Sequence, residues 1–143
     1  MVHRSILAVA AALAVLALLG CGGGEAGEQA APATEAQSEQ AAVLVTRDCG
    51  RQEVVPRTHV PAGQTAMQAL ERVADVDKAS GGKLVTAIEG VAQDEGKKLA
   101  WLFYVDGKMA EKGATEIRLE AGDVEWWDLH NWEKQCPVPA AAR

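Results

Sequence analysis

The first feature of the hydropathy pattern is an unbroken apolar run of fourteen residues from Ile6 to Leu19, which His3 and Arg4 precede. At a rise of about 1.5 Å per residue, a helix of this length reaches about 21 Å, whereas the hydrocarbon core of a bilayer is about 30 Å thick. A basic start followed by a short apolar segment is typical of a secretory signal peptide. We therefore predict a signal peptide over residues 1–20 and not a membrane-spanning helix.

The apolar run ends in the sequence Leu18-Leu19-Gly20-Cys21. This sequence resembles a bacterial lipobox, in which the cysteine thiol receives a diacylglycerol group and the preceding peptide bond is then cleaved. The resemblance implies that Cys21, multiply acylated, anchors the protein to the cell membrane on its extracytoplasmic face. The alternative is an ordinary secretory signal that happens to contain a cysteine.

Residues 22–42 contain no aromatic and no basic residue and carry four acidic ones. Such a segment cannot bury enough apolar surface to offset the entropy lost on ordering, so we expect a disordered tether. The predicted organisation is a signal peptide, an acylated cysteine and linker over residues 21–42, a folded domain over residues 43–136, and a tail over residues 137–143.

Beyond the linker, short β-prone runs alternate with turn signals, and one segment has helical periodicity. Thr65 and Gln68 form a capping-box pattern at the start of that helix, and apolar residues spaced by three and four, including Leu70 and Val73, give it one apolar stripe. We expect the helix to end near Val76. The predicted strands cover residues 42–46, 53–60, 84–88, 100–105 and 124–129, with a further extended segment at 116–119.

This order of elements predicts an α+β fold, a small mixed β-sheet with one helix across a face, in the outline of a β-grasp. Pro56 within the second strand favours either a place at the sheet edge or a bend in the strand. Turns are expected at residues 48–50 and 106–107, where Asp and Gly cluster.

Both faces of the predicted sheet carry large aromatic residues. Successive side chains alternate across a strand, so Phe103 and Tyr104 point to opposite faces, as do Trp126 and Trp127. One helix covers only one face of a small sheet. The other face is either covered by the tail around residues 137–140 or left open as an aromatic platform for a flat ligand.

Charge and motifs exclude several classes of function. A net charge of −6 provides no electrostatic footprint for nucleic acid. The chain has no Gly-x-Ser-x-Gly elbow, phosphate-binding loop or His-Glu-x-x-His motif, and nothing pairs a nucleophile with an activating base. We therefore expect a protein that is not an enzyme. Beyond the signal peptide only His59 and His130 are histidines, too few for the usual zinc ligand sets, so no metal site is predicted.

The three cysteines divide into one lipidation site and one pair. With Cys21 acylated, Cys49 and Cys136 remain in an oxidising compartment, and we expect them to form a disulfide. The alternative, a redox-active pair, lacks the close Cys-x-x-Cys spacing.

Several motifs resemble the bacterial transcobalamin-C-terminal-like domain. They are the segment WLFYVDGK at residues 101–108, the Lys-Gly-Ala step at 112–114, and the ending at 119–126 with its Gly-Asp-Val and tryptophan. The helix start at 63–70 and the strand end at 88–91 are also similar, so the resemblance covers about residues 43–132. It departs at Asp106, where the family pattern more often has Asn and where either residue suits a turn.

The resemblance implies a β-grasp-like domain related to the small C-terminal domain of animal cobalamin carriers, which covers one side of the bound corrinoid. Those carriers also contain a large α-helical domain, for which this sequence shows no counterpart. We hypothesise a lipid-anchored extracytoplasmic binding module that presents Tyr104, Trp127, His130 and Trp132 to a planar small molecule, with cobalamin as the candidate. The alternative is a structural or adhesion lipoprotein that docks an envelope protein or a glycan through its aromatic strand face.

Overall fold

The computed structural model describes residues 39–143. The predicted signal peptide, the lipidation site Cys21 and the tether up to residue 38 lie outside the described residues. Among residues 39–143, none of the helices has the length and apolarity that a membrane crossing would need.

A five-stranded sheet forms the centre of the domain, with the strand order β2-β1-β8-β6-β7. Strands β1 and β8 run parallel, and the other neighbours run antiparallel. The prediction that the second strand lies at an edge is confirmed. The strands are β1 (Gln40–Arg47), β2 (Gln52–Pro61), β6 (Leu99–Val105), β7 (Lys108–Met109) and β8 (Val124–Asn131).

The chain enters the sheet earlier than predicted. Strand β1 begins at Gln40, and Ala41 and Ala42 are already buried in the sheet. The expected tether therefore does not extend to residue 42. Small apolar residues resemble a linker in composition, but here the pairing of Gln40 with Pro61 in β2 orders them.

Helix α2 (Ala66–Val73) begins as the sequence predicts. Thr65 is its N-cap, and the reciprocal bonds between Thr65 and Gln68 form a complete capping box. Ala66, Met67, Ala69 and Leu70 are the buried residues of the helix.

The helix ends three residues before the predicted boundary at Val76. The backbone becomes extended at Ala74, and Val76 pairs with Ile88 instead. The segment that the sequence analysis took as the helix end thus starts β3 (Val76–Ala79), which joins β4 (Leu84–Ile88) and β5 (Val91–Ala92) in a second, three-stranded sheet. Single-turn 3₁₀ helices at Ser80–Gly82 (η1) and Glu95–Lys97 (η2) occupy the loops. Residues 116–119 contribute only an isolated bridge from Arg118 to Thr65.

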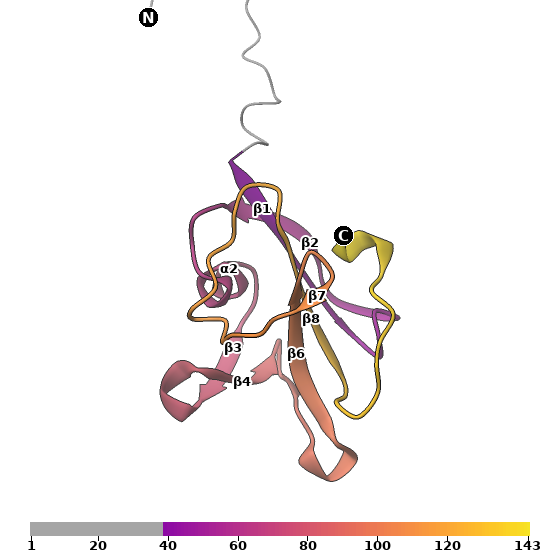
Figure 1. Ribbon diagram of the computed structural model, residues 1–143. Helices are drawn as coiled ribbons and strands as arrows, with labels where there is room; N and C mark the ends of the chain where they lie inside the picture. Colours follow the sequence, from indigo (N-terminus) through magenta and orange to yellow (C-terminus); the bar gives the residue numbers. More distant parts are fainter. Residues whose placement is uncertain (1–38) are drawn as a thin grey trace, which may run out of the picture. The chain divides into compact units, whose positions relative to one another are not determined.

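The five-stranded sheet separates two apolar clusters. The larger lies on the side of α2 and the second sheet and includes Leu70, Trp101 and Trp127. The smaller lies on the opposite side, where Trp126 packs with Ala142 of the C-terminal 3₁₀ helix η3 (Ala140–Ala142). Figure 1 shows this arrangement, with α2, β3 and β4 on one side of the sheet and the C-terminal segment on the other. The α+β fold class is confirmed, although a second sheet joins the helix in covering one face.

Candidate functional site

The open aromatic platform expected from the sequence is not formed. The exposed fractions are 6% for Tyr104, 3% for Trp127 and 3% for His130, and only Trp132, at 44%, is exposed. Strand β8 is central in the sheet, with α2 and the second sheet on one face and the tail on the other. The tail therefore covers the second aromatic face, as in the first of the two alternatives that the sequence left open.

The predicted disulfide between Cys49 and Cys136 is confirmed. The two Cα atoms lie 5.1 Å apart, and the bond joins residues separated by 87 positions. Cys49 lies in the turn after β1, and Cys136 lies in the segment after β8. The bond therefore fastens the tail to the end of the sheet.

A buried polar network surrounds Asp128, next to this disulfide. One carboxylate oxygen accepts bonds from the Thr46 hydroxyl and from the Gly50 amide at 2.9 Å. The other accepts the Cys49 amide at 3.0 Å and lies 2.7 Å from His130 Nδ1. Burial acts to raise the pKa of Asp128, but the bonds from His130, Thr46 and the two amides outweigh it and hold the pKa below its usual value. An ionised carboxylate thus holds the turn after β1 to β8.

Asp128 and His130 do not face solvent beside Trp132, where His130 was expected to meet a ligand. Both residues are buried, because their side chains point to the tail-covered face of β8. His59, the other histidine beyond the predicted signal peptide, is exposed near the opposite end of the sheet, where it pairs with Ala42. The structure therefore brings His130 together with Asp128 and not with His59.

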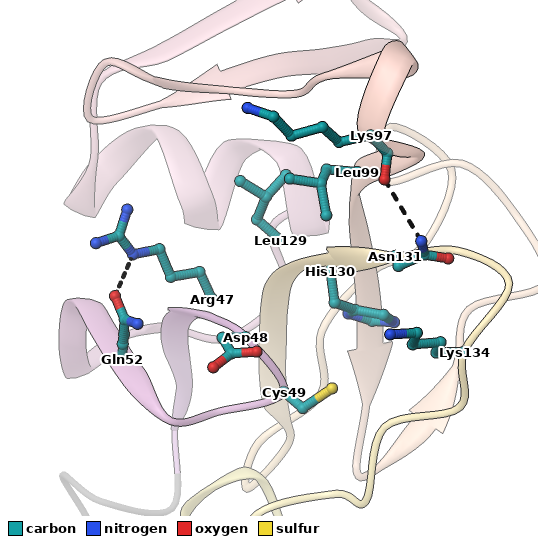
Figure 2. Close-up of a pocket in the computed structure, with 10 residues that line it drawn as sticks. All are labelled: Arg47, Asp48, Cys49, Gln52, Lys97, Leu99, Leu129, His130, Asn131 and Lys134. Carbon is teal, nitrogen blue, oxygen red and sulfur yellow. Dashed lines mark hydrogen bonds between the residues drawn. The ribbon is translucent and has the colours of Figure 1, made fainter.

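A polar pocket of about 590 Å³ lies at the ends of β1 and β8. Three cationic residues and a single acidic one line it, together with His130. Arg47 is held by its Nε bond to Gln52 at 2.7 Å, and Lys97 pairs with Asp94 at 3.0 Å. Figure 2 shows the lining residues gathered around the end of β8. The lining favours polar or anionic groups. The full lining set is Arg47, Asp48, Cys49, Gln52, Lys97, Leu99, Leu129, His130, Asn131 and Lys134.

An apolar pocket of about 230 Å³ opens between the two sheets. Trp101, Phe103 and Trp127 line it from the large sheet, and the Phe103 and Trp127 rings stack with centroids 4.7 Å apart. Leu84 and Met109 are also among the lining residues, and they remain 46% and 56% exposed. These two are among the three large hydrophobic residues that are exposed in the described part of the chain.

The sequence analysis did not identify Leu84 and Met109 as site residues. Leu84 is the first residue of a strand, and Met109 follows the Asp106-Gly107 turn in a strand of two residues. Neither has a periodic pattern long enough to distinguish a core position from a surface one. The signal that was available is an isolated methionine directly after a turn.

A third cavity of about 540 Å³, the tail-side pocket, lies beside the C-terminal segment. Tyr104, Trp132 and Cys136 line it, and Met109 lines both this pocket and the apolar one. Of the four ligand-binding residues predicted from the sequence, the structure places Tyr104 and Trp132 here, Trp127 at the apolar pocket and His130 at the polar pocket. They do not form one site.

Glu125 is a fully buried acid in β8, and its burial was not predicted from the sequence. Burial raises its pKa to about 8, and the hydrogen bond from the Trp127 indole lowers it only in part. Its second carboxyl oxygen, Oε2, has no hydrogen-bond partner within residues 39–143. Glu125 is therefore protonated in the folded protein at neutral pH.

The free energy of unfolding should depend on pH through Glu125. Its folded pKa of about 8 lies above its usual value of 4.5, so between these values the folded state keeps a proton that the unfolded state releases. The stabilisation is complete below the unfolded pKa and is lost as the pH rises through the folded pKa. Between pH 6 and pH 7, urea denaturation should show stability falling by up to about 1.4 kcal/mol relative to the Glu125→Gln variant.

The matched control for this prediction is Glu53→Gln, which changes an exposed glutamate in β2. It should keep the pH dependence of the unaltered protein. Equal pH slopes for the unaltered protein and Glu125→Gln would contradict a protonated Glu125.

Part of the chain matches a known domain family, and its fold is found in solved structures. Residues 63–131 match the family described as a domain of unknown function (DUF4430). No curated protein is significantly similar to the chain in sequence.

Two solved structures share the fold at low sequence identity. One is a "putative metal binding protein" from Ruminococcus gnavus, with 14% identity and a TM-score of 0.51, over 65% of this chain and 97% of that protein. The other is haptocorrin in complex with Cbi, with 14% identity and a TM-score of 0.52, over 66% of this chain. The match spans 26% of the haptocorrin chain. The chain is thus similar over residues 63–131 to the DUF4430 domain family, and its described domain has a fold that haptocorrin shares.

Proposed function

We propose that the domain is a non-catalytic binding module that covers one side of a flat ligand of the corrinoid class, tethered outside the cytoplasmic membrane through Cys21. The observation that carries the proposal is the apolar pocket, whose lining combines stacked aromatic rings with the exposed side chains of Leu84 and Met109. Folding leaves these apolar side chains in water, so a ligand that covers them gains the free energy of their burial.

The size of the apolar pocket indicates how such a ligand is held. A volume of about 230 Å³ is below the range of about 300–1,000 Å³ of pockets that enclose a drug-sized molecule. A larger ring system would therefore lie over the opening and place one edge or one face against Leu84 and Met109. The shared fold with haptocorrin, which was crystallised in complex with Cbi, supports the choice of corrinoids as the first ligands to test.

The test is isothermal titration calorimetry of the purified protein with cobalamin and with cobinamide. Binding with a micromolar or lower Kd is expected for at least one of them. Met109→Glu should weaken this binding at least tenfold, because covering about 60 Å² of apolar surface contributes about 1.5 kcal/mol. The absence of binding heat with both ligands would contradict the proposal.

Trp132→Glu is the matched control, because it introduces the same charge at an exposed apolar side chain that does not line the apolar pocket. It should leave the Kd unchanged. If Trp132→Glu also weakens binding, the ligand site is the tail-side pocket instead, because Trp132 and Met109 both line that pocket.

The alternative of a docking lipoprotein has less support in the structure. It requires an open aromatic strand face, and the tail covers that face with Ala142 and Val138 packed near Trp126.

A further inference from the structure

The disulfide and the buried carboxylate beside it form a compact group of metal-ligating atoms. Cys49 Sγ, Cys136 Sγ and a carboxylate oxygen of Asp128 all lie within 4.8 Å of one another. Ligand atoms around a tetrahedral zinc ion, with bonds of about 2.0–2.3 Å, lie about 3.3–3.8 Å apart. Small movements of the sulfur atoms would therefore bring all three ligands to zinc-binding distances.

Asp128 and Cys49 are fixed by the fold, whereas Cys136 has room to adjust. The Thr46 hydroxyl, the Gly50 amide and His130 Nδ1 hold the carboxylate in place, and Cys49 lies in the tight turn after β1 with a φ of 60°. Cys136 lies outside regular secondary structure. The cluster thus has two preorganised ligands and a third that can move toward a metal ion.

Both cysteines of the disulfide line cavities. Cys49 lines the polar pocket, and Cys136 lines the tail-side pocket. Figure 2 shows the Cys49 sulfur at the margin of the polar pocket, below His130 and Lys134. Small reductants and metal ions therefore have a route to the disulfide from either side, although the Asp128 carboxylate itself is buried.

We propose that reduction of the Cys49–Cys136 disulfide converts this cluster into a Zn²⁺ site with two thiolates and the Asp128 carboxylate as protein ligands. A dithiol reductant supplies two electrons and two protons. The S–S bond breaks, the reductant becomes a disulfide, and Cys49 and Cys136 become thiols. Binding of Zn²⁺ then displaces the two thiol protons.

The surrounding charges suit this ligand set. Two thiolates and one carboxylate carry three negative charges, so the site with Zn²⁺ has a net charge of −1. Arg47 and Lys134 line the pocket that Cys49 borders and offset that charge. The small number of histidines argued against a metal site in the sequence, whereas this ligand set needs only one imidazole, that of His130, as a positioning group for Asp128.

The test uses the full-length protein, reduced with a phosphine that is then removed without air, and titrated with Co²⁺. We expect one Co²⁺ per chain, a thiolate-to-cobalt charge-transfer band in the near ultraviolet, and the visible absorption of a tetrahedral ion. Zn²⁺ should displace the Co²⁺ and remove both signals. The oxidised protein should show neither signal. The absence of a charge-transfer band in the reduced protein would overturn the proposal.

Two variants assign the ligands. Cys49→Ser/Cys136→Ser retains Cys21, so its titration gives any contribution from Cys21 in protein whose Cys21 is not acylated, and the band should be absent. Asp128→Asn should weaken Zn²⁺ binding at least tenfold, whereas Asp48→Asn, an exposed carboxylate beside Cys49, should not. Equal affinity in Asp128→Asn and the unaltered protein would overturn the assignment.

Reduction of the disulfide could also unfold the domain, and far-ultraviolet circular dichroism detects this outcome. If the reduced protein unfolds, Zn²⁺ should restore its far-ultraviolet circular dichroism, because the ligands come together only in the folded chain. A reduced, unfolded protein that Zn²⁺ does not refold would overturn the proposal.

Discussion

Replacing Trp127 by alanine is expected to lower the free energy of unfolding by about 3–5 kcal/mol, the usual cost of removing a large buried aromatic side chain. Trp127 is 3% exposed and stacks on Phe103 within the larger apolar cluster. Its indole N–H also donates to Glu125, so the variant leaves that buried acid without its donor. Urea denaturation at pH 6 measures the change.

The matched control is Trp132→Ala, which removes the same side chain from a position that is 44% exposed. Its effect should stay within about 0.5 kcal/mol, as for most surface substitutions. The contrast between the two variants tests whether Trp127 is a core residue or an exposed ligand platform. Similar, small effects of both would restore the platform hypothesis.

The strand periodicity predicted which aromatic residues share a face, because alternation is a property of the backbone alone. Phe103 and Trp127 lie together in one cluster, and Tyr104 and Trp126 in the other, as expected. The capping box at Thr65 was equally predictable, since both of its hydrogen bonds lie within four residues of sequence.

The sequence left two alternatives for the second face of the sheet, coverage by the tail or an open platform, because coverage depends on segments that are distant in sequence. Tail residue Ala142 reaches the sheet beside Trp126 because the disulfide at Cys136 directs the chain back across it. The same limit applies to Val76, whose partner Ile88 stops the helix and starts a strand. Local patterns favoured a continued helix there, and tertiary pairing prevailed.

The candidate pockets depend on the same long-range contacts. Leu84 and Met109 belong to different sheets, and only the packing of β4 against β6 brings them to one opening. Likewise, the burial of Asp128 was not predictable from the sequence, because its role depends on hydrogen bonds from the distant turn at Cys49 and Gly50. The sequence predicted the disulfide, but not the carboxylate at its side.

Removing the disulfide should have the other large effect on stability. Cys49→Ser/Cys136→Ser frees a loop of 87 residues in the unfolded chain, and the loop-entropy relation gives a loss of about 4–5 kcal/mol. That is a large share of the roughly 5–15 kcal/mol by which small domains are stable. Urea denaturation of the double variant measures the loss, with Cys21→Ser, which leaves the disulfide intact, as the control.

The disulfide also holds the tail against the sheet, so its removal should change the exposure of the aromatic residues there. With the covalent link gone, the contacts of Val138 and Ala142 alone retain the tail over Trp126. Quenching of tryptophan fluorescence by acrylamide should therefore increase in the double variant under conditions where the domain remains folded. A stability loss below about 1 kcal/mol with unchanged quenching would show that packing, and not the disulfide, holds the tail. Zn²⁺ separates this effect from the proposed metal site, because it should stabilise the reduced protein and leave the double variant unchanged.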